Sequence, residues 1–551
     1  MQCRDSGSVF AHYSQGITNL GGSILRRGLG KVFTGAFQVR FFNSRILYTF
    51  RKHKLVILVV ATTGEGDATD NAKSFNRFLA SKSTSVDSFV GLKYCVFGLG
   101  DLNYINFNHM GKRTERNMER LGAIRIHPRG IGDASQDIEA DLRHWIDSGL
   151  LSAIRDHFPN LRRTGSKPVF VLSGVSNLLQ MVVSDGVQET HIEASASATT
   201  LSKVYYTLKP IEIVSRRILS EFAFELTLKI PSSEIAESIE ILPANSQRDI
   251  EWAMSQFAGL YRLDQVVSFV SKDPPFPVPC TLLFALTHYI DISTLGSLSR
   301  TFLANLATLL GNHELEDLVV THMSFKQFWI KYSEQFELTL GMSEFLQIAP
   351  KQKIRPYTQA GNFDNAVRII VAPVSDGVCS DYLCHEVEIG DKILARTRPS
   401  VFSSHQTSYP LLAIVTGAGI APFMSIMASN PDGAIHLIFG CRGLDDGFLY
   451  KDEILEWQAQ GRITCHFAFS RSEEPEHFAF SRGYVQDIVK GDKEVHRLID
   501  SIAAGPEGRI IVCGRTAMGR SVCDAIAGQL GGQIQLEQLA TRGALAVEYF
   551  G

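Results

Sequence analysis

The sequence predicts a soluble protein of several domains and of mixed α/β and β class, with a parallel sheet towards each end and an antiparallel barrel between them. Two observations predict this order: strand–turn–helix patterns fill both ends of the chain, and apolar and polar residues alternate between them as in antiparallel strands. At roughly 150 residues per domain, the 551 residues allow about three to four domains. The expected segments are the first sheet at 1–150, a linker at 151–203, the barrel at 204–407 with a helical insert at about 247–345, and the second sheet at 408–551.

The composition argues against several classes of protein. Lys and Arg total 54 and Asp and Glu total 57, so no overall positive charge favours non-specific binding of nucleic acid. The nine cysteines are scattered without a CxxC pair, which argues against a disulfide framework or a zinc ribbon and favours a reducing compartment. No apolar run approaches the roughly 18 residues of a transmembrane anchor. We therefore expect a cytoplasmic protein that binds no metal.

The first 54 residues are strongly basic, with nine Lys or Arg residues against the single acid Asp5. This bias is typical of a mitochondrial-type targeting segment, which makes a mitochondrion-related organelle the alternative location. A folded first strand–helix unit is the competing interpretation.

Two turns at the ends of predicted strands form the first candidate site. The strand 55–61 runs into a turn at 62–69, and the strand 93–97 runs into a turn at 98–104. The carboxyl ends of neighbouring parallel strands form the ligand crevice of an open α/β sheet. Glycines in both turns would let the backbone approach a flat polar ring, on which Tyr104 could stack. Each turn taken alone is equally well explained by ordinary turn chemistry.

The barrel segment contains a second candidate site. Arg355, Tyr357 and Thr358 place a guanidinium, an aromatic ring and a hydroxyl within four residues, and alternate residues of a strand share one side. Such a set suits a pyrophosphate and a ring system, although on a surface strand it would usually be incidental. Residues 377–380 precede a predicted helix, where backbone N–H groups and the helix dipole favour an anion.

A third site is predicted in the second sheet. The Gly-Ala-Gly turn at 417–419 opens a helix whose N-terminus can hold a dinucleotide pyrophosphate. The ends of the following strands offer hydroxyl and guanidinium donors, which bind a 2′-phosphate and so separate NADP from NAD. These donors are Ser470, Arg471, Arg482 and Tyr484. As an isolated cluster they would more often be a solvated basic patch.

The motifs of all three sites, in this order, resemble those of the NADPH-dependent diflavin reductases, the cytochrome P450 reductase-like family. Residues 62–67 (Thr-Thr-Gly-Glu-Gly-Asp) and 97–101 (Phe-Gly-Leu-Gly-Asp) are similar to the second and third flavin loops of that family. The motifs at 355–358 and 377–380 resemble its FAD motifs, and the proline-rich segment at 275–279 resembles its inserted connecting region. In length the chain is most similar to the diflavin reductase that serves iron–sulfur cluster assembly.

The resemblance implies three domains: a flavodoxin-like domain with FMN, an FAD-binding β-barrel with a helical insert, and a ferredoxin-NADP reductase-like domain that binds NADPH. The implied FMN residues are Thr62, Thr63, Gly64, Glu65, Gly66, Gly98, Leu99, Gly100, Asp101, Tyr104 and Asn108. The implied FAD residues are Arg355, Tyr357, Thr358, Gly377, Val378, Cys379 and Ser380. The implied NADPH residues are Gly417, Gly419, Cys441, Arg442, Ser470, Arg471, Arg482, Tyr484 and Gln486.

The resemblance also implies an electron-transfer reaction. Hydride passes from NADPH to FAD, and single electrons then pass through FMN to an acceptor protein that carries an iron–sulfur or haem centre. The implied catalytic residues are Thr358, Cys513, Glu548 and Phe550. Taken without the resemblance, Cys513 would be a buried thiol and Phe550 a packing anchor.

The sequence departs from the family pattern at several positions. The expected phosphate loop of the flavodoxin domain corresponds at best to Ser14–Thr18, which is short by one residue, and Thr63 stands where an aromatic residue is common. Arg482 stands where Lys is common, and Phe550 replaces the usual Trp. Two alternatives follow: a reductase that holds FAD alone and uses the first domain for docking, or a non-catalytic binding protein on the same fold.

Overall fold

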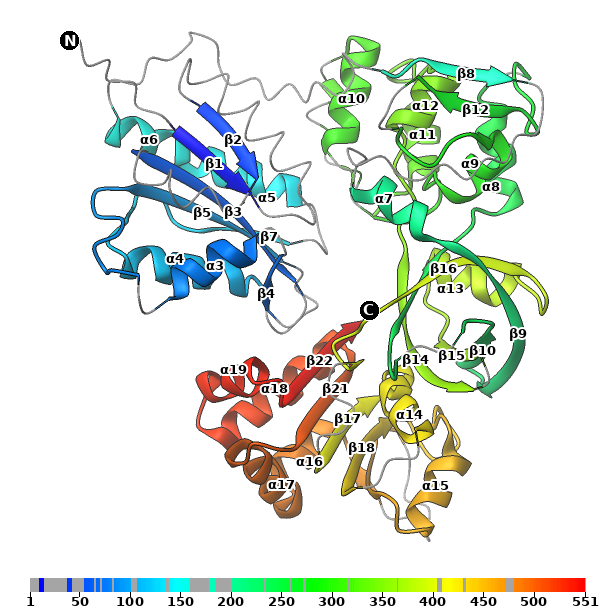
Figure 1. Cartoon of the computed structure of the whole chain (residues 1–551). Helices are drawn as coiled ribbons and strands as arrows, with labels where there is room; N and C mark the ends of the chain where they lie inside the picture. Colours follow the sequence, from blue (N-terminus) through cyan, green and yellow to red (C-terminus); the bar gives the residue numbers. More distant parts are fainter. Residues whose placement is uncertain are drawn as a thin grey trace. The chain divides into compact units, whose positions relative to one another are not determined.

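The structure is a computed structural model whose chain divides into two units (Figure 1). One unit contains the first sheet and the helical insert and consists of residues 1–102, 106–206 and 247–351. The other consists of residues 103–105, 207–246 and 352–551. The described residues are 9–13, 37–41, 54–63, 66–69, 72–81, 84–100, 107–133, 138–158, 178–184, 200–231, 234–257, 259–270, 274–296, 298, 300–312, 314–315, 318, 320, 322–363, 365–403, 409–429, 433–471 and 480–550.

The first sheet has the strand order β2-β1-β3-β5-β6, with β7 pairing β5 and the short β4 pairing β3. All pairs except β3–β4 are parallel. The strands are β1 (Val9–Tyr13), β2 (Phe37–Phe41), β3 (Leu55–Thr63), β4 (Asp67–Ala68), β5 (Lys93–Gly100), β6 (Ile124–Arg125) and β7 (Gly130–Asp133). Because β1 and β2 lie within the basic first 54 residues, the structure favours a folded unit there over a targeting segment.

Helices cover both faces of this sheet, because alternate residues of β3 point to opposite sides. Leu55, Ile57 and Val59 pack with α5 (Ile138–Trp145), the π-helical turn η2 (Ile146–Leu150) and α6 (Leu151–His157). Val56, Leu58 and Val60 pack with α3 (Lys73–Ala80) and α4 (His109–Arg120). This two-faced burial explains the continuous apolar run of β3.

The helical insert lies between two barrel strands in sequence, as predicted. Its helices are α8 (Gln247–Ser255), α9 (Leu282–His288), α10 (Arg300–Leu310), α11 (Phe325–Tyr332) and α12 (Met342–Ile348). A three-stranded sheet of β13 (Cys280–Thr281), β12 (Val266–Phe269) and β8 (Met181–Ser184) belongs to the same unit. The predicted linker thus contains α6, β8 and the start of α7 (Thr200–Thr207).

The barrel is closed, with the strand order β10-β15-β14-β11-β16-β9 and antiparallel pairing throughout. Its strands are β9 (Lys209–Ser220), β10 (Ala223–Leu228), β11 (Ser238–Leu242), β14 (Arg355–Phe363), β15 (Ala366–Val371) and β16 (Lys392–Arg398). The helical turns α13 (Val378–Asp381) and η5 (Tyr382–Glu386) supply Cys379, Tyr382 and Leu383 to the barrel core.

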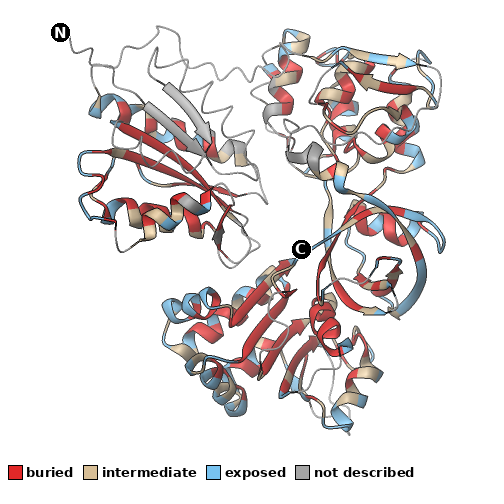
Figure 2. Cartoon of the chain, viewed as in Figure 1, coloured by how far each residue is buried: buried red, intermediate tan, exposed pale blue. Residues whose placement is uncertain are grey.

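The second sheet is parallel throughout, with the order β20-β19-β18-β17-β21-β22. Its strands are β17 (Leu411–Thr416), β18 (Ile435–Cys441), β19 (Thr464–Phe469), β20 (Ser481–Arg482), β21 (Arg509–Arg515) and β22 (Leu545–Phe550). The covering helices are η7 (Gly417–Ile420), α14 (Ala421–Ala428), α15 (Lys451–Ala459), α16 (Val485–Gly491), α17 (Lys493–Ala504), α18 (Thr516–Leu530) and α19 (Gln533–Thr541). Figure 2 shows that the strands are buried and the outer helix surfaces exposed.

One apolar core joins the barrel to the second sheet. Ala236 and Ala360 from the barrel segment pack in the same cluster as Val415 and Phe423 from the nucleotide turn region. The Ser425 hydroxyl accepts the backbone N–H of Ala236 at 2.8 Å. Barrel and second sheet therefore hold each other in a fixed position. Within the part of the chain that the structure describes, no helix combines the length and apolar character needed to cross a bilayer.

Candidate functional site

Three strands bring Thr358, Glu548 and Cys513 together at the junction of the barrel and the second sheet. The Thr358 hydroxyl, on β14, donates to Glu548 Oε2 at 3.0 Å. Cys513 on β21 is the register partner of Glu548 on β22. The structure thus unites three of the four predicted catalytic residues. The fourth, Phe550, lies two residues along the same strand and is 38% exposed.

The protonation of this cluster follows from its burial. Desolvation raises the pKa of the Glu548 carboxyl, and the hydrogen bond from Thr358 lowers it in part. Desolvation also raises the pKa of the Cys513 thiol well above its ordinary value, and the nearby Glu548 raises it further. Burial therefore favours the neutral thiol over the thiolate at this position. Glu548 is the group of this cluster that can exchange a proton.

The nucleotide turn between β17 and α14 lies directly against this cluster. Gly417 has a φ of +52°, which glycine adopts at no steric cost. A Cβ atom on Gly419 would lie 2.3 Å from the backbone carbonyl oxygen of Cys513, so only glycine fits there. The predicted pyrophosphate turn is thus packed on the end of the strand that carries Cys513.

The predicted 2′-phosphate residues gather at the ends of β18, β19 and β20. The backbone N–H and hydroxyl of Ser470 donate to the Cys441 carbonyl at 3.1 and 3.3 Å, and the Arg471 N–H donates to the Arg442 carbonyl at 2.9 Å. Arg482 is the register partner of Phe469, next to Ser470.

The charges at this corner differ in how far they are already paired. Arg471, Arg482 and Tyr484 are exposed, and within the described ranges neither arginine has a carboxylate partner. Arg442 Nη1 is 3.6 Å from Asp446 Oδ1, and the guanidinium carbon lies 4.3 Å from the centre of the Phe222 ring. The Arg442 guanidinium therefore already has interaction partners within the protein. Gln486 Oε1 is buried with no hydrogen-bond partner in the described part of the chain.

The predicted FAD residues lie together on β14 and α13. The Tyr357 hydroxyl hydrogen-bonds to the Cys379 thiol, and burial raises the pKa of both groups, that of Cys379 to about 11. Arg355 Nη1 donates to the Lys353 carbonyl at 3.0 Å. Its remaining N–H groups can still bind an anion, as the resemblance implies.

The turn at 377–380 has a structural role that the sequence did not show. The Ser380 hydroxyl donates to the Gly377 carbonyl at 2.9 Å and accepts the Val374 N–H at 3.1 Å, so it closes the turn. The Asp381 N–H makes the first bond of the helical turn, to the Gly377 carbonyl. The N–H groups of the three preceding residues therefore have no partner within the helix, and they can face an anion.

The two predicted FMN turns are held together by the start of α4. The Met110 N–H donates to Thr62 Oγ1 at 3.1 Å, and His109 Nδ1 lies 2.8 Å from the Gly66 carbonyl oxygen. Asn108 Nδ2 donates to the Gly98 carbonyl at 2.8 Å from a side chain that is 1% exposed. His109 was not predicted, although its position directly after Asn108 could have indicated it.

Packing within the protein also requires glycine at positions 98 and 100. A Cβ atom on Gly98 would collide with Asn108 Oδ1, and one on Gly100 would lie 2.8 Å from the backbone nitrogen of Asn108. Gly98–Gly100 continue β5 rather than forming a turn, because they pair with β7. Thr63 ends β3. Gly64, Glu65, Asp101 and Tyr104, together with Ser14–Thr18, lie outside the described residues, and Ser14 directly follows β1 in the sequence.

This arrangement defines an oxidoreductase built from a doubly wound parallel sheet, a closed antiparallel barrel and a nucleotide-binding parallel sheet. Residues 24–145 match the family model of flavodoxin, and residues 413–524 match that of the oxidoreductase NAD-binding domain. These two matches and the relatives described below support the diflavin reductase family, and the predicted fold class is confirmed.

The relatives are similar along most of their length. The chain is 26% identical to NADPH–cytochrome P450 reductase of Phanerodontia chrysosporium, over 88% of this chain and 82% of that protein. It is 27% identical to NADPH-dependent diflavin oxidoreductase 1 of Mus musculus, over 83% of each chain. It is also 27% identical to NADPH–cytochrome P450 reductase of Sus scrofa, over 87% of this chain and 77% of that protein.

Proposed function

We propose that the protein is an NADPH-dependent diflavin reductase that delivers single electrons to an acceptor protein. The observation that carries this proposal is the 3.0 Å hydrogen bond between Thr358 and Glu548 beside Cys513. It joins the strand of the predicted FAD motif to the sheet of the predicted nucleotide motif. When bound, NADPH, FAD and FMN would supply the redox chemistry, which is hydride transfer followed by transfer of single electrons.

Thr358 and Glu548 orient the reacting rings, and Glu548 takes up or releases a proton. The Thr358 hydroxyl holds one carboxylate oxygen of Glu548, which leaves the other oxygen for a proton or a ligand. Because desolvation raises the Glu548 pKa, this carboxyl takes up a proton more readily than an exposed glutamate. Cys513 presents a neutral, polarisable thiol next to it. Phe550 is exposed at the end of β22 and would be available to cover a ring face.

The donors at 470–484 select the nucleotide. Arg471 and Arg482 are exposed and able to bind a 2′-phosphate, with the Ser470 and Tyr484 hydroxyls as neutral donors. The turn at 417–419 holds the pyrophosphate against the end of β21, close to Cys513. Arg355 and the N–H groups after Gly377 hold the FAD pyrophosphate. The turns joined by α4, with Tyr104, hold the FMN ring.

The acceptor is an iron–sulfur or haem protein in this proposal. We also propose that this reductase is located in a reducing compartment such as the cytoplasm. The eight described cysteines, all of them free thiols, support this location.

Flavin analysis combined with steady-state kinetics tests the proposal. The purified protein is expected to release FAD and FMN on acid denaturation and to reduce ferricyanide faster with NADPH than with NADH. Arg471→Ala should lower this preference about 10- to 100-fold, since a charge-assisted hydrogen bond contributes roughly 1.5–3 kcal/mol.

Two results would redirect the proposal. FAD without FMN, and no response to added FMN, would support the reductase that holds FAD alone and docks through its first domain. A protein that binds neither flavin nor NADPH would be the non-catalytic binding protein.

A further inference from the structure

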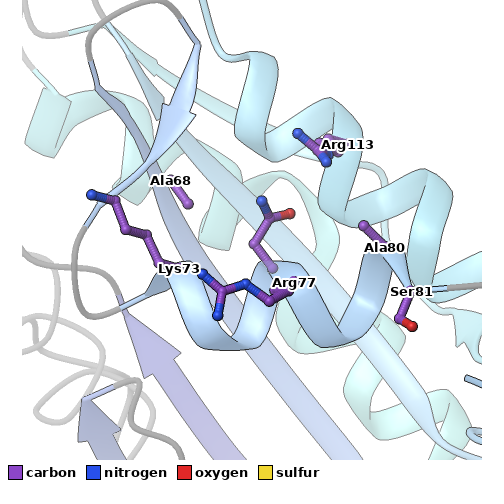
Figure 3. A pocket seen from close by; sticks show the side chains of 7 residues that line it. Ala68, Lys73, Arg77, Ala80, Ser81 and Arg113 are labelled. Carbon is purple, nitrogen blue, oxygen red and sulfur yellow. The ribbon is translucent and has the colours of Figure 1, made fainter. Parts of the chain in front are cut away.

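A groove between α3 and α4 of the first domain is lined by positive charge. The groove has a volume of about 460 Å³. It is lined by Ala68, Lys73, Asn76, Arg77, Ala80, Ser81 and Arg113. Figure 3 shows Lys73 and Arg77 on one helix and Arg113 on the other. None of these lining residues is acidic or aromatic.

The positive charge extends beyond the groove along both helices. Lys73 and Arg77 are four residues apart on α3 and therefore share one face, as do Arg113 and Arg116 on α4. Lys73, Arg77 and Arg116 are exposed. The guanidinium of Arg120 donates to the Leu79 carbonyl at the end of α3, which ties the two helices together.

The carboxylates of these helices do not neutralise this charge. Glu115 and Glu119 are the acids of α4, and α3 has none. Glu115 is 9% exposed and paired with Arg125 and Arg129, and Glu119 is 3.8 Å from Arg125. In the ranges that the structure describes, Arg77, Arg113 and Arg116 have no ion-pair partner. Like charges this close repel one another, so a partner that brings carboxylates would stabilise the face.

The groove adjoins the turns proposed to hold FMN. Ala68 belongs to β4, which is the next strand after β3, and α4 is the next helix after β5. The His109 side chain contacts Gly66, which lies between β3 and β4, and the Asn108 side chain contacts Gly98 near the end of β5. A protein bound along α3 and α4 would therefore lie beside the segments proposed to hold FMN.

We infer that the α3–α4 face is the docking surface for an acidic protein, the electron acceptor of this reductase. Exposed arginines on two helices suit carboxylates presented by a protein surface, which raise the association rate and fix the orientation of the partner. Nucleic acid is disfavoured because no aromatic side chain lines the groove for base stacking. The electron-transfer part of the inference rests on the proposed function, whereas the binding part does not.

Direct binding to two haem proteins of opposite charge tests the surface. Soluble cytochrome b5 serves as the acidic probe and cytochrome c as the basic one. The full chain should bind cytochrome b5 with a Kd that rises with salt, since screening weakens exposed charge pairs. Arg77→Glu combined with Arg113→Glu should raise this Kd at least about tenfold at low salt. Arg155→Glu is the matched control, because Arg155 is exposed on α6, across the sheet from α3 and α4.

Activity separates this inference from the proposed function. NADPH-dependent reduction of ferricyanide and flavin content should stay unchanged in the Arg77→Glu, Arg113→Glu variant, while the KM for cytochrome b5 rises in parallel with its Kd. If the unaltered protein did not reduce ferricyanide with NADPH, the proposed function would be contradicted, but the binding measurements would still test the docking surface.

Three outcomes would overturn the docking surface. The first is that the unaltered protein binds cytochrome b5 no better than cytochrome c. The second is that the double variant binds cytochrome b5 as tightly as the unaltered protein or the Arg155→Glu control. The third is that a 20-nucleotide single strand of DNA, or inorganic phosphate, displaces cytochrome b5 while itself losing affinity in the double variant, which would make that ligand the occupant.

Discussion

At the scale of single residues, several glycines are required by the approach of another backbone or side chain. The sequence analysis explained the glycines of these segments by close contact with a ligand. The structure adds that a side chain at these positions would collide with other atoms of the protein. The Gly419 backbone lies against the end of β21, and Gly98 lies against the Asn108 amide. A sequence pattern cannot distinguish these two reasons, because both call for the same missing side chain.

Gly419→Ala is expected to raise the KM for NADPH at least about tenfold while FAD stays bound. The new methyl group would lie 2.3 Å from the Cys513 carbonyl oxygen, so the turn must move away from the position that holds the pyrophosphate. Gly528→Ala is the matched control, since its Cβ would meet nothing within 4 Å inside α18. Similar NADPH affinity for both variants would show that the turn accommodates a side chain.

The pair Thr358 and Glu548 predicts a shift in the pH profile. The hydrogen bond from Thr358 lowers the pKa of Glu548 against the raising effect of desolvation. Thr358→Val removes that bond, so the Glu548 pKa rises and the corresponding inflection in the rate of NADPH-dependent ferricyanide reduction moves to higher pH. In Glu548→Gln the inflection should disappear. An inflection retained by Glu548→Gln would belong to another group.

At the scale of helices and strands, pairing between distant segments decided what the sequence could not. The predicted strands at 55–61 and 93–97 were confirmed, and each extends by two or three residues in the structure. The extension of the second strand depends on pairing with β3 on one side and with β7, thirty residues further along, on the other. The strands β1 and β2 were hidden in a basic segment whose composition favoured a targeting signal. Periodicity reports burial of a segment and contains no information about its partner.

The capping box of α11 gives a prediction at this scale. Ser324 Oγ accepts the Gln327 N–H at 3.2 Å, and Gln327 Oε1 accepts the Ser324 N–H at 3.1 Å. Ser324→Ala should destabilise the insert by about 1 kcal/mol, because the Gln327 N–H loses its acceptor at a buried helix start. Native-state hydrogen exchange in α11 measures this cost. Ser521→Ala in α18 is the control, since its hydroxyl only bonds back to the Ala517 carbonyl.

At the scale of the molecule, polar contacts reinforce the core shared by the barrel and the second sheet. The Tyr450 hydroxyl, at the start of α15, donates to Glu225 Oε2 on β10 at 2.6 Å. Arg368 lies 3.4 Å from the same carboxylate. Both Tyr450 and Glu225 are buried. The domain order was predictable from the motifs, whereas this contact was not, because it joins residues 225 positions apart.

Tyr450→Phe should reduce the stability of the barrel and second sheet by about 1.5–3 kcal/mol, since a buried carboxylate loses a hydrogen-bond donor. Thermal release of FAD, followed by its fluorescence, measures the change. The control is Lys229→Ala, which removes the 3.0 Å pair with Glu212 on the barrel. Because 64% of the Lys229 side chain is exposed, its removal should cost no more than about 1 kcal/mol. Equal losses for the two variants would contradict the role given to the buried contact.

The shared core also determines where this protein can be cut for engineering. A chimaera that exchanges only residues 408–551 would separate Val415 and Phe423 from Ala236 and Ala360, leaving apolar surface on both fragments that invites aggregation. A chimaera that exchanges 207–246 together with 352–551 would keep this core whole. The module that takes electrons from the nucleotide, residues 207–246 with 352–551, is therefore discontinuous in sequence. The helical insert at 247–351 separates its two segments and is a segment that a designer can replace.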